Sequence, residues 1–256
     1  MKKLFLTLMA LAATMSIDAQ MVKITNGDQL LVKYLVPNGG KVAFEKAPPI
    51  TGSVYAKEPN CEIGWVQLWL DGPKFAVCNI GAANNAPEDY GGYYTWGGKN
   101  KNGNGIEFFD DHNETNNGSK NLSGTDDTAT YLWGDNWRMP TKEEFEALVN
   151  NENCTCTWTD NYNGTGVTGL LCAGKEGTAF SSNSVFLPAA GHCDHGGILL
   201  KGVTGLYWSS VPNGIYYAYD LHFNSGLQED LSSSRSMCFP VRAVLNEAYA
   251  TDGNER

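Results

Sequence analysis

The chain has 256 residues, of which 18 are basic and 28 acidic, so its formal net charge is −10. Because nucleic acids and anionic membrane surfaces are bound through clustered Lys and Arg side chains, this balance argues against both as partners. Only 18% of the residues are charged and 29 are Gly, a composition that indicates a loop-rich globular protein.

Residues 1–19 have the pattern of a secretory signal peptide. Lys2 and Lys3 precede an apolar run that ends at Met15, and Ala19 is a small residue at the expected cleavage site. The apolar run of about 12 residues is too short to cross a bilayer. We therefore expect an exported protein without a transmembrane segment, either secreted, at the cell surface or in the periplasm.

Residues 20–46 predict a small β-meander, and residues 47–62 a linker. Asn26-Gly27 is a strong signal for a two-residue hairpin turn. The three strands are expected at 21–25, 30–36 and 42–44. Pro48 and Pro49 lack the N–H groups that a β-ladder needs, so they favour a linker.

Two helices are expected in the part that follows. The first covers 125–133, with Asp126 and Asp127 in its first turn and Gly134 after its end. The second covers 140–150. There Thr141 and Glu144 form a capping box. Its apolar residues at i, i+3 and i+4, which should share one face, are Phe145, Leu148 and Val149.

The other regular elements are short strands separated by polar loops. We expect these strands at 65–70, 75–78, 185–187, 206–209, 216–223 and 238–244, with loops at 100–123 and 228–235. Two helices in a chain of strands and loops indicate the α+β class and not a βαβ alternation.

The strand at 216–223 carries the most informative surface. Because side chains alternate between faces along a strand, one face is expected in the core and carries Tyr217, Tyr219, Leu221 and Phe223. The opposite face is expected to be exposed and carries Tyr216, Asp220, His222 and Asn224, with Ala218 between them. Such a mixture is used at binding surfaces, although an ordinary solvated face of a sheet would look the same.

Seven cysteines follow the signal peptide, so at least one cannot join an intramolecular disulfide. Cys154 or Cys156 with Cys172 is the most economical pairing, since these residues flank a Gly- and Asn-rich turn. Several buried thiols are the alternative. Residues 192–195, His-Cys-Asp-His, look most like a metal site but have no second half, so we assign no metal and no cofactor. Oxygen-rich residues 113–127 leave calcium as an open alternative.

Several motifs together resemble the Fibrobacter succinogenes major paralogous domain, which is abundant in secreted proteins of gut Bacteroidetes. They are FAVCNIGA at 75–82, PEDYGGYYTWG at 87–97, WGDNWRMPT at 133–141, FLPAAG at 186–191, YWSS at 207–210 and FPVRAV at 239–244. The resemblance implies a C-type-lectin-like domain over 63–245 with two helices, a twisted antiparallel sheet and long loops, followed by a flexible tail at 246–256. Three tryptophans within these motifs are expected to pack in the core, with sugar stacking as the alternative, namely Trp96, Trp137 and Trp208.

The resemblance would place the loop residues Gln228, Ser233, Ser234 and Arg235 beside the exposed face of strand 216–223. We therefore expect a non-enzymatic surface protein that recognises an extracellular glycan or protein through these residues and Tyr216, Asp220, His222 and Asn224. A structural or tip subunit of a surface assembly is the alternative. An enzyme related to formylglycine-generating enzymes ranks third, because Cys238 stands alone near the end of the domain and no catalytic residue is assigned.

Overall fold

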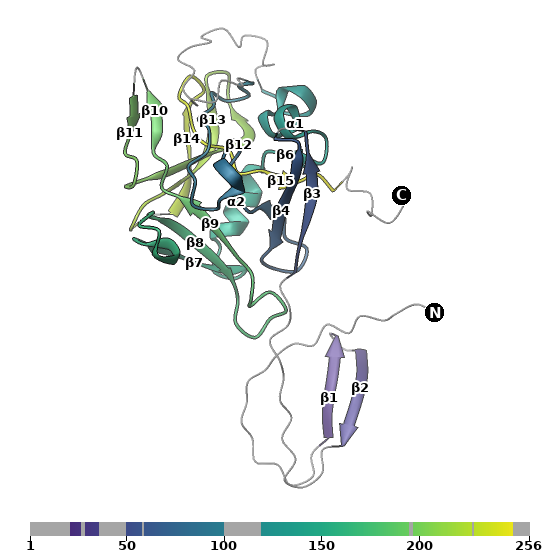
Figure 1. The fold of residues 1–256 in the computed structure, drawn as a ribbon. Coiled ribbons are helices and arrows are strands. Elements are labelled where there is room, and N and C mark those ends of the chain that lie inside the picture. The colour runs from purple at the N-terminus through teal and green to yellow at the C-terminus, as the bar shows by residue number, and fades with distance from the viewer. Residues whose placement is uncertain are drawn as a thin grey trace.

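The computed structural model describes residues 21–26, 29–35, 50–57, 59–99, 119–194, 197–226 and 228–247 (Figure 1). The expected signal peptide, the expected third strand of the meander at 42–44 and the tail beyond residue 247 lie outside the described residues. No helix in the described part of the chain is long and apolar enough to cross a membrane.

The described residues form two α-helices and fifteen strands, which confirms the α+β class. Every pair of named strands runs antiparallel. The finer expectation of a C-type-lectin-like fold remains a prediction.

The strands make five sheets. Two have two strands each, namely β1 (Met21–Asn26) with β2 (Gln29–Leu35) and β10 (His192–Asp194) with β11 (Gly197–Leu199). A five-stranded sheet has the order β3 (Thr51–Ala56), β4 (Cys61–Gln67), β5 (Lys74–Ala76), β15 (Val244–Leu245) and β6 (Trp137–Arg138). One three-stranded sheet has the order β7 (Cys154–Thr159), β8 (Gly169–Gly174) and β9 (Ser184–Pro188). The other three-stranded sheet has the order β12 (Gly205–Asn213), β13 (Tyr217–Phe223) and β14 (Gln228–Ser234).

Helix α2 (Lys142–Val149) follows the sequence prediction closely. The Thr141 hydroxyl accepts from the Glu144 N–H, and the Glu144 carboxylate accepts from the Thr141 N–H, so the capping box is complete. Phe145 and Leu148 are buried as expected, and the helix packs against β7 and the β12–β14 sheet.

Helix α1 (Thr128–Trp133) is shorter than predicted, because Asp127 is its N-cap and not a residue of its first turn. The Asp127 carboxylate accepts from the N–H groups of Ala129, Thr130 and, across the turn, Met139. Burial nevertheless raises the pKa of Asp127 to about 6. Gly134 ends the helix as expected.

Three sequence predictions about linkers, loops and strands are wrong. The expected linker is wrong from Thr51 onward, because β3 pairs with β4 along its whole length. The expected loop at 228–235 contains β14, whose seven residues all pair with β13 and whose poor strand propensity is overridden by that ladder. The expected strand at 238–244 is reduced to Val244–Leu245 preceded by isolated bridges, since Pro240 has no N–H to donate.

The core has two main parts, and the β12–β14 sheet lies between them. Ala218 and Trp208 belong to one cluster, whereas Leu221 and Phe223 belong to the other. Both faces of this sheet are therefore covered near its centre. Trp96, Trp137 and Trp208 are all buried, as expected for core residues.

Arg242 lies fully buried at the junction of β5 and β9. Its guanidinium donates to Asn79 Oδ1 (2.9 Å), the Ala76 carbonyl (3.0 Å) and the Phe186 carbonyl (2.9 Å). Asn79 in turn donates to the Tyr207 hydroxyl (3.1 Å). Burial lowers the pKa of Arg242, and in the described residues its hydrogen-bond partners are neutral groups. The side chain thus joins segments that are far apart in the sequence.

Candidate functional site

The turn between β12 and β13 presents the most exposed cluster of large side chains near the predicted site. Three consecutive residues, Ile215, Tyr216 and Tyr217, are 57%, 72% and 51% exposed. Gly214, with φ of 73°, allows the tight reversal that precedes them. We call residues 213–217 the hairpin tip. The tip confirms the expected exposure of Tyr216.

Arg235 fixes the backbone of the hairpin tip. Its guanidinium donates to the Gly214 carbonyl (2.6 Å) and the Tyr217 carbonyl (3.1 Å) and lies 4.1 Å from the ring centre of Trp96. Trp96 is itself buried and donates from its indole N–H to the Ser209 carbonyl (2.8 Å). Arg235, predicted as a ligand contact, is a partly buried side chain that supports the backbone of the tip.

Tyr217 was expected in the core and is exposed, so that expectation is wrong. Tyr217 is the first residue of β13 and pairs with Asn213 and Ser234 at the end of the ladder. The alternation of faces continues to this position, but the packed clusters include Leu221 and Phe223 and do not include Tyr217. A residue on the core side of a strand is buried only where something covers that side.

Asp220 was expected on an exposed face and is 1% exposed, so that expectation is also wrong. It lies opposite Trp208 on β12 and Leu231 on β14, in the face that the first core cluster covers. Neither carboxylate oxygen accepts a hydrogen bond of ordinary geometry from the described residues. Burial raises the pKa of Asp220 to about 7, and the nearby Ser233 hydroxyl lowers it only in part.

The other predicted site residues do not gather around Tyr216. His222 is half-buried opposite Glu229, and burial lowers its pKa although Glu229 acts in the opposite direction. Asn224 closes a local turn by accepting from the Gly226 N–H (2.9 Å). Ser234 lies beside the tip, where it pairs with Tyr217, and the Ser233 backbone pairs with Ala218. The Gln228 side chain lies outside the described residues.

The structure therefore brings Tyr216, Ser234 and Arg235 together. Asp220 and His222 lie progressively further along β13, and Asn224 follows the end of that strand. The sequence interpretation missed Ile215 as a site residue and assigned Tyr217 to the core. The Asn213-Gly214 dipeptide, a strong turn signal, could have identified the exposed turn just before these residues.

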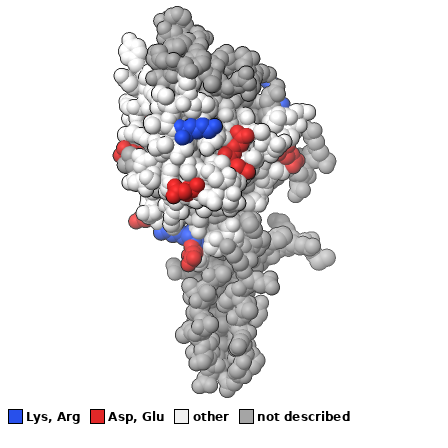
Figure 2. Space-filling view, turned by 60° about the vertical axis from the view of Figure 1, so that its left-hand side comes forward, with Lys and Arg blue, Asp and Glu red and all other residues white. Residues whose placement is uncertain are grey.

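Figure 2 shows one face of the molecule on which the charged side chains are few and scattered among uncharged ones. On this face Lys and Arg side chains do not form the cluster that phosphate binding requires.

A cleft of about 450 Å³ lies beside α2 and is built from other elements than the hairpin tip. Its charged residues include two ion pairs, Arg138 with Glu144 and Lys74 with Glu247. Trp69 lines one side of the cleft, and its ring lies against Gly72. The pairing of these charges makes the cleft a polar depression of the surface.

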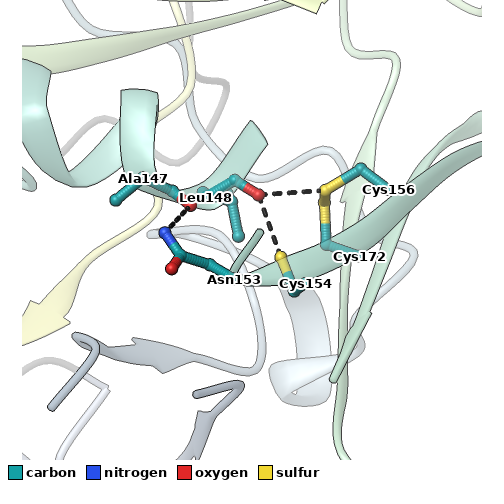
Figure 3. The surroundings of a disulfide bond; sticks show 6 residues. All are labelled: Ala147, Leu148, Asn153, Cys154, Cys156 and Cys172. Carbon is teal, nitrogen blue, oxygen red and sulfur yellow. Dashed lines mark hydrogen bonds between the residues drawn. A yellow bond between two sulfur atoms is a disulfide. The ribbon is translucent and has the colours of Figure 1, made fainter. Parts of the chain in front are cut away.

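The cysteine pairing expected from the sequence is confirmed in one of its two forms. Cys156 and Cys172 lie opposite each other on β7 and β8 and form a disulfide with a Cα–Cα distance of 4.0 Å (Figure 3). The Cys154 thiol donates to the Leu148 carbonyl (2.9 Å), to which the Cys156 sulfur also lies close. Burial raises the pKa of Cys154 to about 12 and that of Cys78 to about 11, so neither thiol is a good nucleophile at neutral pH.

Cys238 stands alone near the end of the sequence, but in the structure it lies beside Cys193. Cys238 and Cys193 exchange both backbone hydrogen bonds, of 2.9 and 3.1 Å, in an isolated antiparallel bridge. His192 and Cys193 belong to β10, and His195 of the same motif lies outside the described residues. No group of three His, Cys, Asp or Glu side chains that could hold a metal ion occurs in the part of the chain that the structure describes. Residues 113–118 of the oxygen-rich segment considered for calcium lie outside it, and residues 119–127 lie inside it.

No family model, no curated protein and no solved structure matches the chain. The family resemblance stated from the motifs accordingly remains a prediction.

Proposed function

We propose that this is an exported, non-enzymatic recognition protein that binds an extracellular protein through the hairpin tip. The proposal is supported chiefly by one observation, the three consecutive side chains of Ile215, Tyr216 and Tyr217 with more than half of their surface exposed. Clustered exposed apolar surface of this kind is typical of interaction sites.

The chemistry of the tip suits binding to a protein surface. Tyrosine combines a large apolar ring with a hydroxyl that forms hydrogen bonds, and it is enriched among the residues that dominate binding energy. Consecutive exposed residues in a turn form a protrusion, which fits a depression on a partner, whereas small ligands are usually enclosed in clefts.

The support of the tip by Arg235 bears on affinity. Arg235 bonds to the carbonyls of Gly214 and Tyr217 and stacks on a buried ring, so the backbone of the tip is held before any ligand arrives. A pre-ordered contact surface loses less conformational entropy on binding than a flexible one. Recognition by this tip therefore requires Arg235 although its guanidinium already has partners within the chain.

The proposal is tested by retention on an extracellular protein array and, in parallel, a glycan array. Wild-type protein should be retained by a protein, and Tyr216→Ala/Tyr217→Ala should weaken retention by about tenfold or more. Leu70→Ala is the matched control, because Leu70 is 75% exposed outside the tip, and it should bind like wild type. Retention only on the glycan array would change the ligand class. No retention on either array, or equal retention of the double variant, would overturn the proposal.

A structural subunit of a surface assembly is the second candidate, and β1 and β2 favour it. Among the described strands these two pair only with each other, so within the described residues each has one edge without a ladder partner, and such an edge is what strand addition uses. In this case neighbouring proteins should co-purify with the full chain and should be lost when residues 21–46 are deleted. Unchanged co-purification by the deleted form would exclude docking through this segment.

A further inference from the structure

Two cysteines that are 45 positions apart in the sequence lie directly opposite each other in the fold. Cys193 belongs to β10, and Cys238 belongs to the segment that leads to β15. The Cys193 N–H donates to the Cys238 carbonyl (2.9 Å), and the Cys238 N–H donates to the Cys193 carbonyl (3.1 Å). These two hydrogen bonds define a hydrogen-bonded antiparallel pair.

The geometry of such a pair is compatible with a disulfide. The Cα atoms of a hydrogen-bonded antiparallel pair are about 5.5 Å apart, which is within the usual range for disulfides. Directly paired residues also project their side chains to the same face of the ladder. Both cysteines are buried in one small cluster that includes Tyr93 and Ala190.

We propose that Cys193 and Cys238 form a second disulfide when the protein is in an oxidising compartment. The two S–H bonds break and one S–S bond forms. The two protons and two electrons pass to the disulfide of a thiol–disulfide oxidoreductase, which becomes a dithiol. Glutathione disulfide can take the same role in vitro. This modification site goes beyond the proposed function and does not depend on it.

The bond would enclose the sheet that carries the hairpin tip. The chain between Cys193 and Cys238 contains β11, β12, β13 and β14, together with Arg235. Closing a loop of this length restricts the unfolded chain more than the Cys156–Cys172 bond, whose sequence separation is 16. The second disulfide therefore stabilises the part of the fold from which the tip projects.

Peptide mapping of the wild-type chain separates the two bonds. Trypsin should place Cys154, Cys156 and Cys172 in one peptide, 143–175, whereas Cys193 lies in peptide 176–201 and Cys238 in peptide 236–242. After equilibration with glutathione disulfide and alkylation in denaturant, we expect peptides 176–201 and 236–242 to be joined, with three of the seven cysteines alkylated. Alkylated Cys193 and Cys238 in protein that retains the Cys156–Cys172 bond would overturn the proposal.

A stability measurement tests the same bond without mass analysis. In Cys156→Ala/Cys172→Ala the first disulfide is absent, so any remaining effect of a reductant reports on other disulfides. We expect dithiothreitol to lower the Tm of this variant by about 10 °C. The matched control adds Cys193→Ala and Cys238→Ala to that variant and should show no effect of dithiothreitol. An unchanged Tm in the first variant would contradict the proposal.

Discussion

Arg242 and Asp220 are both buried ionisable side chains, and their surroundings differ in hydrogen bonding. Arg242 donates to one amide oxygen and two backbone carbonyls from separate segments. Asp220, on β13 of the sheet that carries the hairpin tip, accepts no hydrogen bond of ordinary geometry from the described residues. A satisfied buried charge fixes the arrangement of the groups around it, whereas an unsatisfied carboxyl makes stability depend on its protonation. The region around Arg242 should therefore be the more rigid of the two and the less sensitive to pH.

The largest expected effect comes from removing the satisfied charge. Arg242→Met leaves the carbonyls of Ala76 and Phe186 and the side-chain oxygen of Asn79 without their donor, so we expect a loss of about 3–5 kcal/mol in the free energy of unfolding. Urea denaturation measures it. Lys74→Met, which removes a partly exposed ion pair with Glu247, should cost no more than about 1 kcal/mol. Similar losses in both variants would contradict the central role of Arg242.

The next effect concerns Asp220 and depends on pH. Because burial raises the pKa of this acid from 3.8 to about 7, the folded protein keeps the proton while the unfolded chain releases it. Its contribution to stability is thus complete below pH 4 and is lost as the pH rises to about 7. A shift of about three units corresponds to about 4 kcal/mol.

Asp220→Asn should remove this dependence, so the variant should gain stability relative to wild type between pH 4 and pH 8. Asp127 shifts in the same direction, and the difference between variant and wild type is therefore the quantity to measure by urea denaturation. Asp135→Asn, at an exposed carboxyl, is the control and should leave the profile unchanged. Parallel profiles for Asp220→Asn and wild type would show that Asp220 ionises normally.

A smaller effect is expected at the start of α2, where the polar groups of the capping box are hydrogen-bonded, as those around Arg242 are. Thr141→Ala removes the hydroxyl that accepts from the Glu144 N–H, at a cost of about 1 kcal/mol. Thr141→Ser keeps the acceptor and should stay within about 0.5 kcal/mol of wild type. Thermal unfolding distinguishes the two variants, and equal melting temperatures would mean that the cap contributes nothing.

The smallest effect on stability is expected at the tip itself. Tyr216 is 72% exposed, so Tyr216→Ala should change the free energy of unfolding by no more than about 0.5 kcal/mol. Arg235→Ala should be more costly, because the carbonyls of Gly214 and Tyr217 lose a donor and Trp96 loses its stacking partner. Equal costs in thermal unfolding would argue that Arg235 does not support the tip.

Features that depend on neighbouring residues in the sequence were predicted correctly. Features that depend on which distant parts of the chain pack against a residue were missed. Thr141, Glu144 and the apolar stripe of α2 are read within one turn of helix, and the structure reproduces them. The period of two along β13 correctly separates Leu221 from Asp220, but it cannot tell that both faces are covered. The polar strand β14 likewise exists through its pairing with β13 and not through its own propensity.

Two further features also depend on tertiary structure and not on local sequence. They are the proximity of Cys193 to Cys238 and the support of the tip by Arg235. Their partners lie far away in the sequence, at separations that no spacing pattern encodes. The exposure of the tip residues could have been predicted from the local sequence, because Asn213-Gly214 marks the turn that places them in solvent.

Site-specific photo-crosslinking tests recognition by the hairpin tip most directly. A photoreactive amino acid is introduced at Tyr216 in one variant and at Leu70 in another, two positions of similar exposure in different turns. Each variant is then irradiated with the protein retained on the array. We predict a covalent adduct from position 216 and none from position 70. Adducts from both positions, or from position 70 alone, would contradict the assignment of recognition to the tip.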